Sequence, residues 1–307
     1  ARRQSAVQRL IMPPPAGTAK NWAAYRDRFV EPSRVAAGAA FWQAHASELA
    51  RAEKAYGVPP EVVVAIVGVE TFYGRFTGGF RVLDALATLA FDFPTGRKDR
   101  SAFFRDELEE LFVWCAREGL DPLAPRGSYA GAMGYPQFMP SSWRNLAVDF
   151  DADGKIDLLN DPIDAIGSVA NYFKANGWQN NAPITARARI ISDNYDDAAN
   201  NKDLKALSTL PELAGKGLAA REGKWDAATP VNAIRLQGDN GAEFWLAFNN
   251  FYVITSYNRS LLYAMAVYQL SEAIKEQHNQ LKIGEDTFPA PAPADGAPAT
   301  LTPAPAP

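Results

Sequence analysis

One glutamate stands inside the most apolar stretch of the chain. In "AIVGVETFYGRF", residues 65–76, Glu70 follows a run of valines and Ile66. The step from Ile66 to Glu70 is four residues, or about 40° of rotation on a helix, so Glu70 lies on or beside the apolar stripe. Burial disfavours the charged form of a carboxyl group and raises its pKa, which suits a general acid. An ion pair with a structural Arg75 or Arg81 is the alternative, and helical phase alone leaves both readings open.

A second group of chemically capable residues lies in "DFDADGKIDLLNDPID", residues 149–164. Asp149, Asp151 and Asp153 occupy alternate positions, and Gly154 follows at the sixth. This spacing matches the start of an EF-hand loop, in which three oxygen ligands converge on one cation and the glycine allows a sharp turn. At the seventh position the backbone carbonyl of Lys155 would contribute.

The end of this loop departs from the EF-hand pattern. The twelfth position holds Asn160 in place of the usual glutamate. Asp161 or Asp164 would therefore have to provide the last cation ligand, in a loop longer than twelve residues. A solvated acidic turn is the alternative, but so many aspartates in nine residues repel one another without a cation. We therefore predict a structural calcium ion at 149–164.

Composition excludes several other kinds of site. The single cysteine, Cys115, cannot form an intrachain disulfide and is expected to be a small buried hydrophobe, and the two histidines, His45 and His278, have no partner at metal-ligand spacing. The net charge of −4 without a basic stretch argues against nucleic-acid binding. The longest apolar runs are shorter than the ~20 residues of a transmembrane helix, so we expect no membrane span.

The elements that must position these groups are mostly helical in the first part of the chain. Pro59 and Pro60 suit a helix start, Gly74 a stop, and Ser101 an N-cap. The alternation of apolar residues then predicts strands, with a hairpin turn at 239–241. The predicted helices are 22–30, 38–56, 60–74, 82–91, 101–119, 162–176 and 259–282, and the predicted strand regions are 184–191 and 231–248.

The chain is thus expected to be α+β but mainly α. We assign an N-terminal lead-in with a helical segment at 1–37, a helical core at 38–178 and a small β subdomain at 179–254. A helical part at 255–284 returns to the core, and a disordered tail rich in proline and alanine follows at 285–307.

Three ordered motifs resemble one known family. "VGVETFYGRFTG", "GSYAGAMGYPQFMPSSW" and "DPIDAIGSVANYFKANGW" are similar to the membrane-bound lytic transglycosylase B family of bacterial cell-wall enzymes, over about 20–282. The resemblance implies a goose-type lysozyme-like core. It also implies cleavage of the β-1,4 bond between N-acetylmuramic acid and N-acetylglucosamine in peptidoglycan, with a 1,6-anhydromuramoyl product.

The same resemblance implies roles for particular residues. Glu70 matches the family's single catalytic acid/base, and Asp164 matches the last ligand of the calcium loop, in which this chain carries one extra residue. A basic pair that contacts substrate has no certain counterpart among Arg97, Lys98 and Arg100. The residues that match groups lining the cleft are Tyr25, Ser128, Gln137, Tyr172, Tyr257, Asn258 and Tyr263.

Most glycosidases use two carboxylates, but no second acid stands in a comparable motif here. Asp84 and Asp92 are the nearest candidates, and we expect both to be structural. A site with one acid must take its nucleophile from the substrate. Each cleft residue also has a simpler reading: the tyrosines as core aromatics with satisfied hydroxyls, Gln137 as the cap of a turn, and Ser128 as a turn residue.

The sequence therefore predicts a monomeric periplasmic lytic transglycosylase. Its expected partners are peptidoglycan glycan strands and other cell-wall enzymes, with calcium as a structural ion and no organic cofactor. A hydrolytic muramidase on the same core is one alternative. A non-catalytic peptidoglycan-binding or scaffold module is the other, since the tail is typical of a linker or a docking segment.

Overall fold

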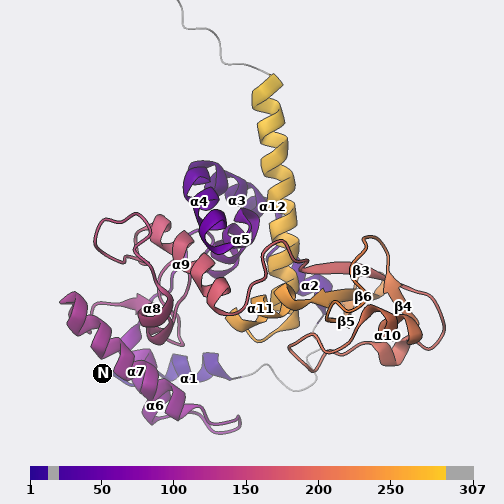
Figure 1. Ribbon diagram of the computed structural model, residues 1–307. Helices are drawn as coiled ribbons and strands as arrows, with labels where there is room; N and C mark the ends of the chain where they lie inside the picture. Colours follow the sequence, from indigo (N-terminus) through magenta and orange to yellow (C-terminus); the bar gives the residue numbers. More distant parts are fainter. Residues whose placement is uncertain (13–20, 288–307) are drawn as a thin grey trace, which may run out of the picture.

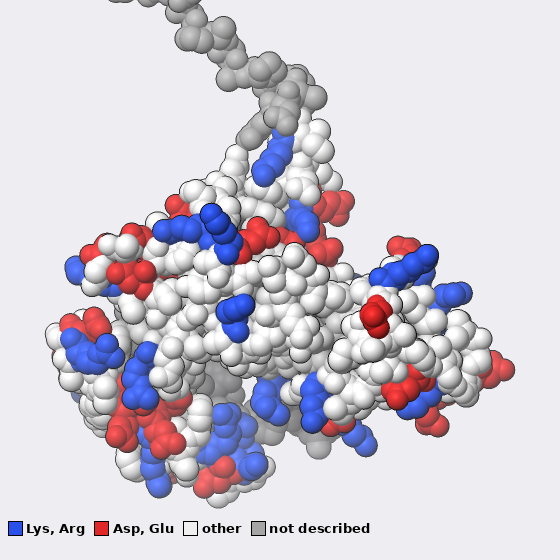
Figure 2. All heavy atoms as spheres, viewed as in Figure 1, with Lys and Arg blue, Asp and Glu red and all other residues white. Residues whose placement is uncertain are grey.

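The computed structural model describes residues 1–12 and 21–287 of the chain (Figure 1). Residues 13–20 of the predicted lead-in and most of the proline- and alanine-rich tail lie outside these residues. None of the helices in the described ranges is both long enough and apolar enough to cross a bilayer. Figure 2 shows side chains of both charges interspersed around the edge of a broad central area that carries few charged side chains.

The central helix of the molecule is α5 (Pro60–Thr71), which is buried on nearly every side. Its first four valines, Val62, Val63, Val64 and Val67, and Ile66 are at most 1% exposed. A helix that is apolar all round must be enclosed by other elements. Those elements form the first hydrophobic cluster with α5: α2 (Trp22–Arg26), α3 (Pro32–Ala44), α4 (Ala46–Tyr56), α9 (Pro162–Ala175), α11 (Asn249–Tyr257) and α12 (Leu261–Thr287).

A second cluster packs below this core in Figure 1. Leu86 and Leu89 of α6 are fully buried against Phe104 and Leu111 of α7. The predicted burial of Cys115 is confirmed, because its side chain lies in this cluster at 0% exposure. The elements are α1 (Ser5–Ile11), β1 (Phe80–Arg81), α6 (Val82–Phe91), α7 (Ser101–Glu118), β2 (Arg126–Gly127) and α8 (Pro140–Leu146).

A four-stranded antiparallel sheet forms the third cluster, at the right of Figure 1, in the order β4-β3-β6-β5. The predicted hairpin is confirmed: Asp239 and Asn240 form the turn, and Gly241 begins the return strand at φ 109°. Glycine adopts this φ without steric cost. The elements are β3 (Thr185–Ile190), η1 (Tyr195–Ala198), α10 (Leu210–Gly215), β4 (Leu218–Ala220), β5 (Val231–Gly238) and β6 (Gly241–Phe248).

Several predicted elements need correction. The helix expected at 38–56 is two helices, because His45 has non-helical angles (φ −123°, ψ 31°). The break lets α3 pack on α12 while α4 packs on α9. No proline or glycine at this point in the sequence indicates that the helix is interrupted.

Ser101 is the first residue of α7 rather than its N-cap. The Asp99 carboxylate accepts a hydrogen bond from the Ser101 backbone nitrogen at 2.8 Å. The short helix α1 was not predicted.

Two boundaries also differ from those assigned to the β subdomain and the tail. Residues 249–254 belong to α11 rather than to the sheet, because the strand β6 ends at Phe248. The last helix continues to Thr287 and so includes 285–287, which had been assigned to the tail. The last helix, α12, follows the sheet in the chain and packs on both α3 and α5.

A strained turn ends α5 directly after Glu70. Phe72, Tyr73 and Gly74 all have positive φ, at 51°, 59° and 85°. Left-handed angles are rare for aromatic residues and persist only where surrounding contacts enforce them. The Thr71 hydroxyl supplies two of these contacts: it donates to the Tyr135 carbonyl at 3.0 Å and accepts from the Gly74 nitrogen at 3.0 Å.

The Tyr73 side chain is held against α3 and α5. Its hydroxyl donates to the Arg34 carbonyl at 2.8 Å, and its ring lies where side chains at Gly38 and Gly68 would be. A Cβ at Gly68 would stand 2.6 Å from the hydroxyl oxygen and 2.8 Å from Cζ. The turn that follows Glu70 therefore depends on two glycines.

We predict that Gly68→Ala destabilises the protein although alanine is the better helix former. The helix-propensity gain is about 1 kcal/mol, whereas forcing the Tyr73 ring aside costs on the order of 1–3 kcal/mol. Gly215→Ala in α10 is the matched control, because a Cβ there meets nothing within 4 Å. Urea denaturation measures both, and a Gly68→Ala variant at least as stable as the control would contradict the packing argument.

Candidate active site

Glu70 is the second-last residue of α5, where the buried helix reaches the surface of the core. Glu70 and Val69 are partly exposed, in contrast to the buried residues 61–68 that precede them. The Tyr263 hydroxyl, from the first turn of α12, donates a hydrogen bond to Glu70 Oε1 at 2.5 Å. The carboxyl group is thus surrounded by protein but still accessible to a ligand.

Burial raises the pKa of Glu70 from 4.5 to about 7, and the hydrogen bond from Tyr263 opposes that rise. This confirms the raised pKa expected from the sequence. No cation and no second carboxylate among the described residues contributes to the shift. A carboxyl group with this pKa is partly protonated near neutral pH and can both give and accept a proton.

The alternative of a structural ion pair is not supported. Arg75 lies over the Phe72 ring, with Cζ 5.0 Å from the ring centroid. Arg81 pairs with Asp84 at 2.9 Å. Glu70 takes part in no ion pair within residues 1–12 and 21–287, and its one hydrogen-bonded partner is a tyrosine.

The four tyrosines expected in the cleft converge on Glu70 from four helices. They are Tyr25 of α2, Tyr172 of α9, Tyr257 of α11 and Tyr263 of α12. Burial raises the pKa of all four hydroxyls, and the negative charge of Glu70 raises them further. The structure therefore brings these residues together around the carboxyl group.

Two of these tyrosines have hydroxyls bonded to the backbone. Tyr257 donates to the Pro136 carbonyl at 2.8 Å and Tyr172 to the Ser256 carbonyl at 2.9 Å. Their rings are in contact, with centroids 4.6 Å apart. The hydroxyls of Tyr172 and Tyr257 are thus satisfied by backbone carbonyls, as the simpler interpretation expected. Their rings are the part of these side chains that a ligand could contact.

Ser128 and Gln137 lie in the same loop, between β2 and α8. The Ser128 hydroxyl accepts from the backbone nitrogens of Ala130 and Ala132 at 3.2 and 3.1 Å, so it holds a turn. The Gln137 amide nitrogen donates to the carbonyls of Thr77 and Gly134 at 3.0 and 2.9 Å. Neither side chain bonds Glu70, and Gln137 instead ties this loop to the one that follows Glu70.

Asn258 follows Tyr257 in extended conformation, and its side chain is exposed. Its carbonyl accepts a hydrogen bond from the Ser260 nitrogen at 2.6 Å, which shapes the connection between α11 and α12. Sequence reasoning missed the supporting roles of Thr71 and Pro136. The signal for Thr71 was its place between Glu70 and the left-handed turn, but its partner Tyr135 is distant in sequence.

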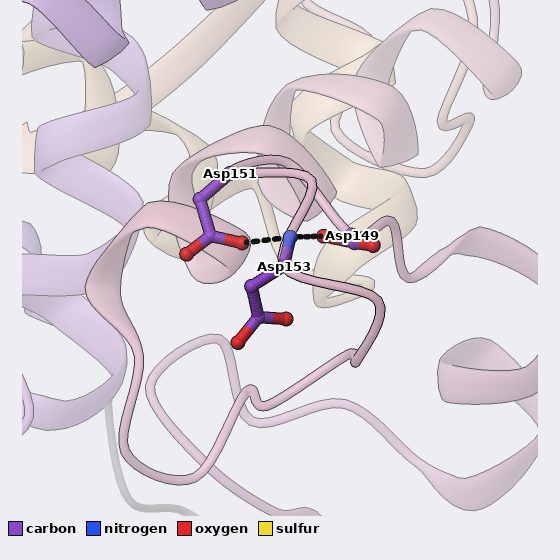
Figure 3. A group of neighbouring side chains, drawn as sticks. All are labelled: Asp149, Asp151 and Asp153. Carbon is purple, nitrogen blue, oxygen red and sulfur yellow. Dashed lines mark hydrogen bonds between the residues drawn. The ribbon is translucent and has the colours of Figure 1, made fainter.

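The acidic loop gathers its carboxylates as the spacing predicts (Figure 3). One carboxylate oxygen from each of Asp149, Asp151 and Asp153 lies within 4.8 Å of the others. The Asp153 backbone nitrogen donates to both Asp149 and Asp151 at 3.1 Å, so the carboxylates of Asp149 and Asp151 face each other across it. Gly154 follows with φ 92°, where the sharp turn needs it.

Asp151 also belongs to a second group of carboxylates, with Asp161 and Asp164. Asp164 is 1% exposed and accepts from the nitrogens of Phe150 at 2.6 Å and Asp157 at 2.8 Å. Burial raises its pKa despite these bonds, and the charges of Asp161 and Asp151 add to the rise. The Asn160 amide nitrogen instead donates to the Asp157 carboxylate at 2.9 Å. This donor set of clustered carboxylates fits a hard divalent cation.

The other candidate acids are structural, as expected. Asp84 is 1% exposed and accepts from the Arg2 nitrogen at 2.6 Å as well as from Arg81. Asp92 pairs with Arg3. Arg97 donates to the Ile11 carbonyl, so it anchors the end of α1. Both acids therefore attach the N-terminal segment to α6.

A family model described as "Transglycosylase SLT domain" matches residues 1–272 of this chain. The chain belongs to the transglycosylase SLT family. The membrane-bound lytic murein transglycosylase B of Escherichia coli (strain K12) is 43% identical over 284 residues, which cover 89% of this chain and 75% of that protein. The resemblance drawn from the three motifs is thus confirmed.

Solved structures agree on the fold. The soluble lytic transglycosylase SltB1 from Pseudomonas aeruginosa is 47% identical, with TM-score 0.83 over 91% of this chain and 90% of that one. The E. coli lytic transglycosylase Slt35 in complex with calcium is 41% identical, with TM-score 0.81 over 91% and 86%. SltB3 from P. aeruginosa in complex with NAG-anhNAM-pentapeptide is 31% identical, with TM-score 0.79 over 89% and 72%.

We predict that Glu70→Gln stabilises the protein, and more so as the pH rises. Between the unfolded pKa near 4.5 and the folded value of about 7, the folded state holds a proton that the unfolded state releases. Wild-type stability therefore falls across this window, by on the order of 2 kcal/mol. Glutamine does not titrate and still offers an oxygen to Tyr263.

Melting temperatures of the two proteins at about pH 5 and pH 8 test this. The variant should have the higher melting temperature, and its difference from the wild type should be larger at pH 8 than at pH 5. A constant difference would mean that the carboxyl group titrates alike in the folded and unfolded states.

Proposed function

We propose that this protein cleaves peptidoglycan glycan strands as a lytic transglycosylase, with Glu70 as its single acid and base. The observation that carries the proposal is the pKa of Glu70, together with its exposure and its hydrogen-bond partner. Its carboxyl group has a pKa of about 7, remains partly exposed, and is hydrogen-bonded to Tyr263 but paired with no cation in the described part of the chain. Membership of the transglycosylase SLT family supports the same activity.

In the proposed reaction, protonated Glu70 gives its proton to the glycosidic oxygen between N-acetylmuramic acid and N-acetylglucosamine. The bond from that oxygen to the muramic C1 then breaks. The 2-acetamido oxygen of the same sugar stabilises the electron-poor C1, as in other substrate-assisted glycosidases. The substrate thereby supplies the group that stabilises C1, which in most glycosidases is a second carboxylate of the enzyme.

Glu70, now ionised, next accepts the proton of the C6 hydroxyl of the muramic residue. The C6 oxygen attacks C1 and closes a 1,6-anhydro ring, and Glu70 is protonated again for the next cycle. No water is consumed. Because nucleophile and electrophile belong to one sugar, the effective concentration of the hydroxyl is high enough to compete with water. The Tyr263 hydroxyl stabilises the carboxylate during the interval in which it is charged.

The remaining cleft residues take binding roles in this proposal. The contacting rings of Tyr172 and Tyr257 offer apolar surface for a sugar face, and Tyr25 borders the carboxyl group from α2. Asn258 is exposed and free to orient an acetamido group. Gln137 and Ser128 act mainly by fixing the loop between β2 and α8.

We predict that digestion of sacculi releases products with 1,6-anhydromuramoyl ends, and that Glu70→Gln lowers the rate by at least about 100-fold. Mass spectrometry of the soluble fragments provides the measurement. Gln280→Glu, an exposed position near the end of α12, is the control, because it makes a glutamine–glutamate exchange away from Glu70. Fragments heavier by one water would instead indicate a hydrolytic muramidase, and turbidity unchanged by either protein would indicate a binding module.

We further propose that the loop at 149–164 holds a structural calcium ion. The side chains of Asp149, Asp151, Asp153 and Asp164, with the Lys155 carbonyl, would bind it. Support comes from the gathered carboxylates, and Slt35, a relative with the same fold, has been solved in complex with calcium. The ion would offset the repulsion within the loop and fix the start of α9, which carries Tyr172.

We predict that chelation lowers the melting temperature and that added calcium restores it, because a ligand that binds only the folded state stabilises it by RT ln(1 + [L]/Kd). Asp153→Ala should melt at the chelated temperature and not respond to calcium. Asp193→Ala, an exposed acid in the β subdomain, should behave as the wild type. An Asp153→Ala variant with the full calcium response would contradict this assignment.

The proposed substrate also sets the location and the partners. Peptidoglycan lies in the cell envelope, and we propose the periplasm as the compartment and a monomer as the acting form. Other cell-wall enzymes are the proposed protein partners.

A further inference from the structure

Phe76 is the most exposed of the large apolar side chains in the described ranges, at 72%. A single exposed phenylalanine is ordinary on a protein surface. This one lies six residues after Glu70, in the segment that continues from the left-handed turn. Its surroundings therefore bear on what the cleft can bind.

The backbone around Phe76 is tied to the candidate active site on both sides. The Phe76 nitrogen donates to the Thr71 carbonyl at 2.9 Å. The carbonyl of the next residue, Thr77, accepts from the Gln137 amide nitrogen at 3.0 Å. A ring on a segment held in this way loses little conformational freedom when it contacts a ligand.

The Phe76 ring leaves much of its surface free. It meets the Phe72 ring edge to face, with centroids 6.2 Å apart and an interplanar angle of 78°. Phe72 itself is covered by two guanidinium groups, those of Arg34 at 4.9 Å and Arg75 at 5.0 Å from its centroid. No guanidinium of the described residues lies over Phe76, so this ring still offers a face to a ligand.

Phe76 is also the outer end of a row of aromatic rings that starts at the cleft. The first two rings have centroids 5.2 Å apart, and the Arg34 guanidinium joins the second ring to the third, at 5.4 and 4.9 Å from their centroids. The charge of Glu70 raises the pKa of the first hydroxyl, so the row begins beside the acid. Its members are Tyr25, Phe29, Phe72 and Phe76, all partly or largely exposed.

The chemistry of Phe76 indicates which part of a substrate it suits. A phenyl ring has no hydrogen-bonding group and no charge, so it gives nothing to a carboxylate or a phosphate. It can cover the C–H face of a sugar ring, because flat apolar surfaces of similar size exclude water from each other. A glycan strand that leaves the cleft along the row would bring such a face to Phe76.

We propose that Phe76 is a binding residue that stacks on a sugar ring of the glycan strand, beyond the two sugars joined by the bond that Glu70 cleaves. The proposal rests on the proposed function, since the strand reaches Phe76 only when it is held at Glu70. Phe76 touches none of the reacting atoms. It strengthens the binding of the strand and leaves the chemical step unchanged.

The kinetic test uses glycan strands from which an amidase has removed the peptides. Phe76→Ala should raise KM about tenfold with little change in kcat. Phe76→Tyr, which keeps the ring, should have the wild-type KM, whereas Phe76→Leu should resemble Phe76→Ala. Phe112→Ala is the control, because Phe112 is 46% exposed on α7 and outside the aromatic row, and its KM should match the wild type.

An unchanged KM in Phe76→Ala would overturn the proposal. So would a wild-type KM in Phe76→Leu, because apolar cover without a ring would then be enough. A fall in kcat at constant KM would equally contradict a role in binding alone.

Binding is measured separately, in the background of Glu70→Gln, by fluorescence titration with the same peptide-free strands. In the Phe76→Trp variant, the emission of the added tryptophan should shift to shorter wavelength as a sugar covers it. Phe112→Trp in the same background should show no shift, and the seven native tryptophans are subtracted with the parent protein.

A Phe76→Trp variant whose emission does not respond to the strands would overturn the stacking. Failure of the proposed function is a different result: the wild type would then release no anhydro products, whereas the titration would still report whether a sugar covers position 76.

Discussion

The burial of one carboxyl group at the end of α5 is the constraint on which the rest of the structure depends. Glu70 sits where a helix enclosed on nearly all sides emerges from the core, and its pKa rises to about 7 because water is largely excluded there. The same burial would be costly for an isolated charge. The Tyr263 hydroxyl reduces that cost by bonding the ionised form. The two opposing effects leave the carboxyl group able to exist in both protonation states.

The position of this group is enforced by the turn that follows it. Three residues in succession have positive φ, and the contacts that hold them come from other parts of the chain: Thr71 bonds Tyr135, and Tyr73 bonds α3. Strain of this kind is stable only in a well-packed environment. Movement of α5 against its neighbours would therefore be transmitted directly to Glu70, and the close packing at Gly38 and Gly68 opposes such movement.

Much of this arrangement could be predicted from the sequence, for identifiable reasons. The periodicity of α5, the glycine turn of the β5–β6 hairpin and the alternate aspartates at 149–153 are local patterns, and each formed as expected. The break at His45 could not be predicted, because it arises from α3 and α4 packing on different helices. The choice between an ion pair and a free acid at Glu70 also needed the structure. Arg75 and Arg81 were plausible partners in sequence, but one lies over Phe72 and the other pairs with Asp84.

Glu70 and its hydrogen-bond partner are 193 residues apart in the sequence, with the whole β subdomain between them. The chain is made from its N-terminus, so α5 leaves the ribosome long before α12. Until α12 packs on α3 and α5, the carboxyl group lacks Tyr263 and the wall that buries it. An unfinished or unfolded chain accordingly carries the acid without its raised pKa. The long-range contact thus delays the capacity to cut the cell wall until the protein is complete.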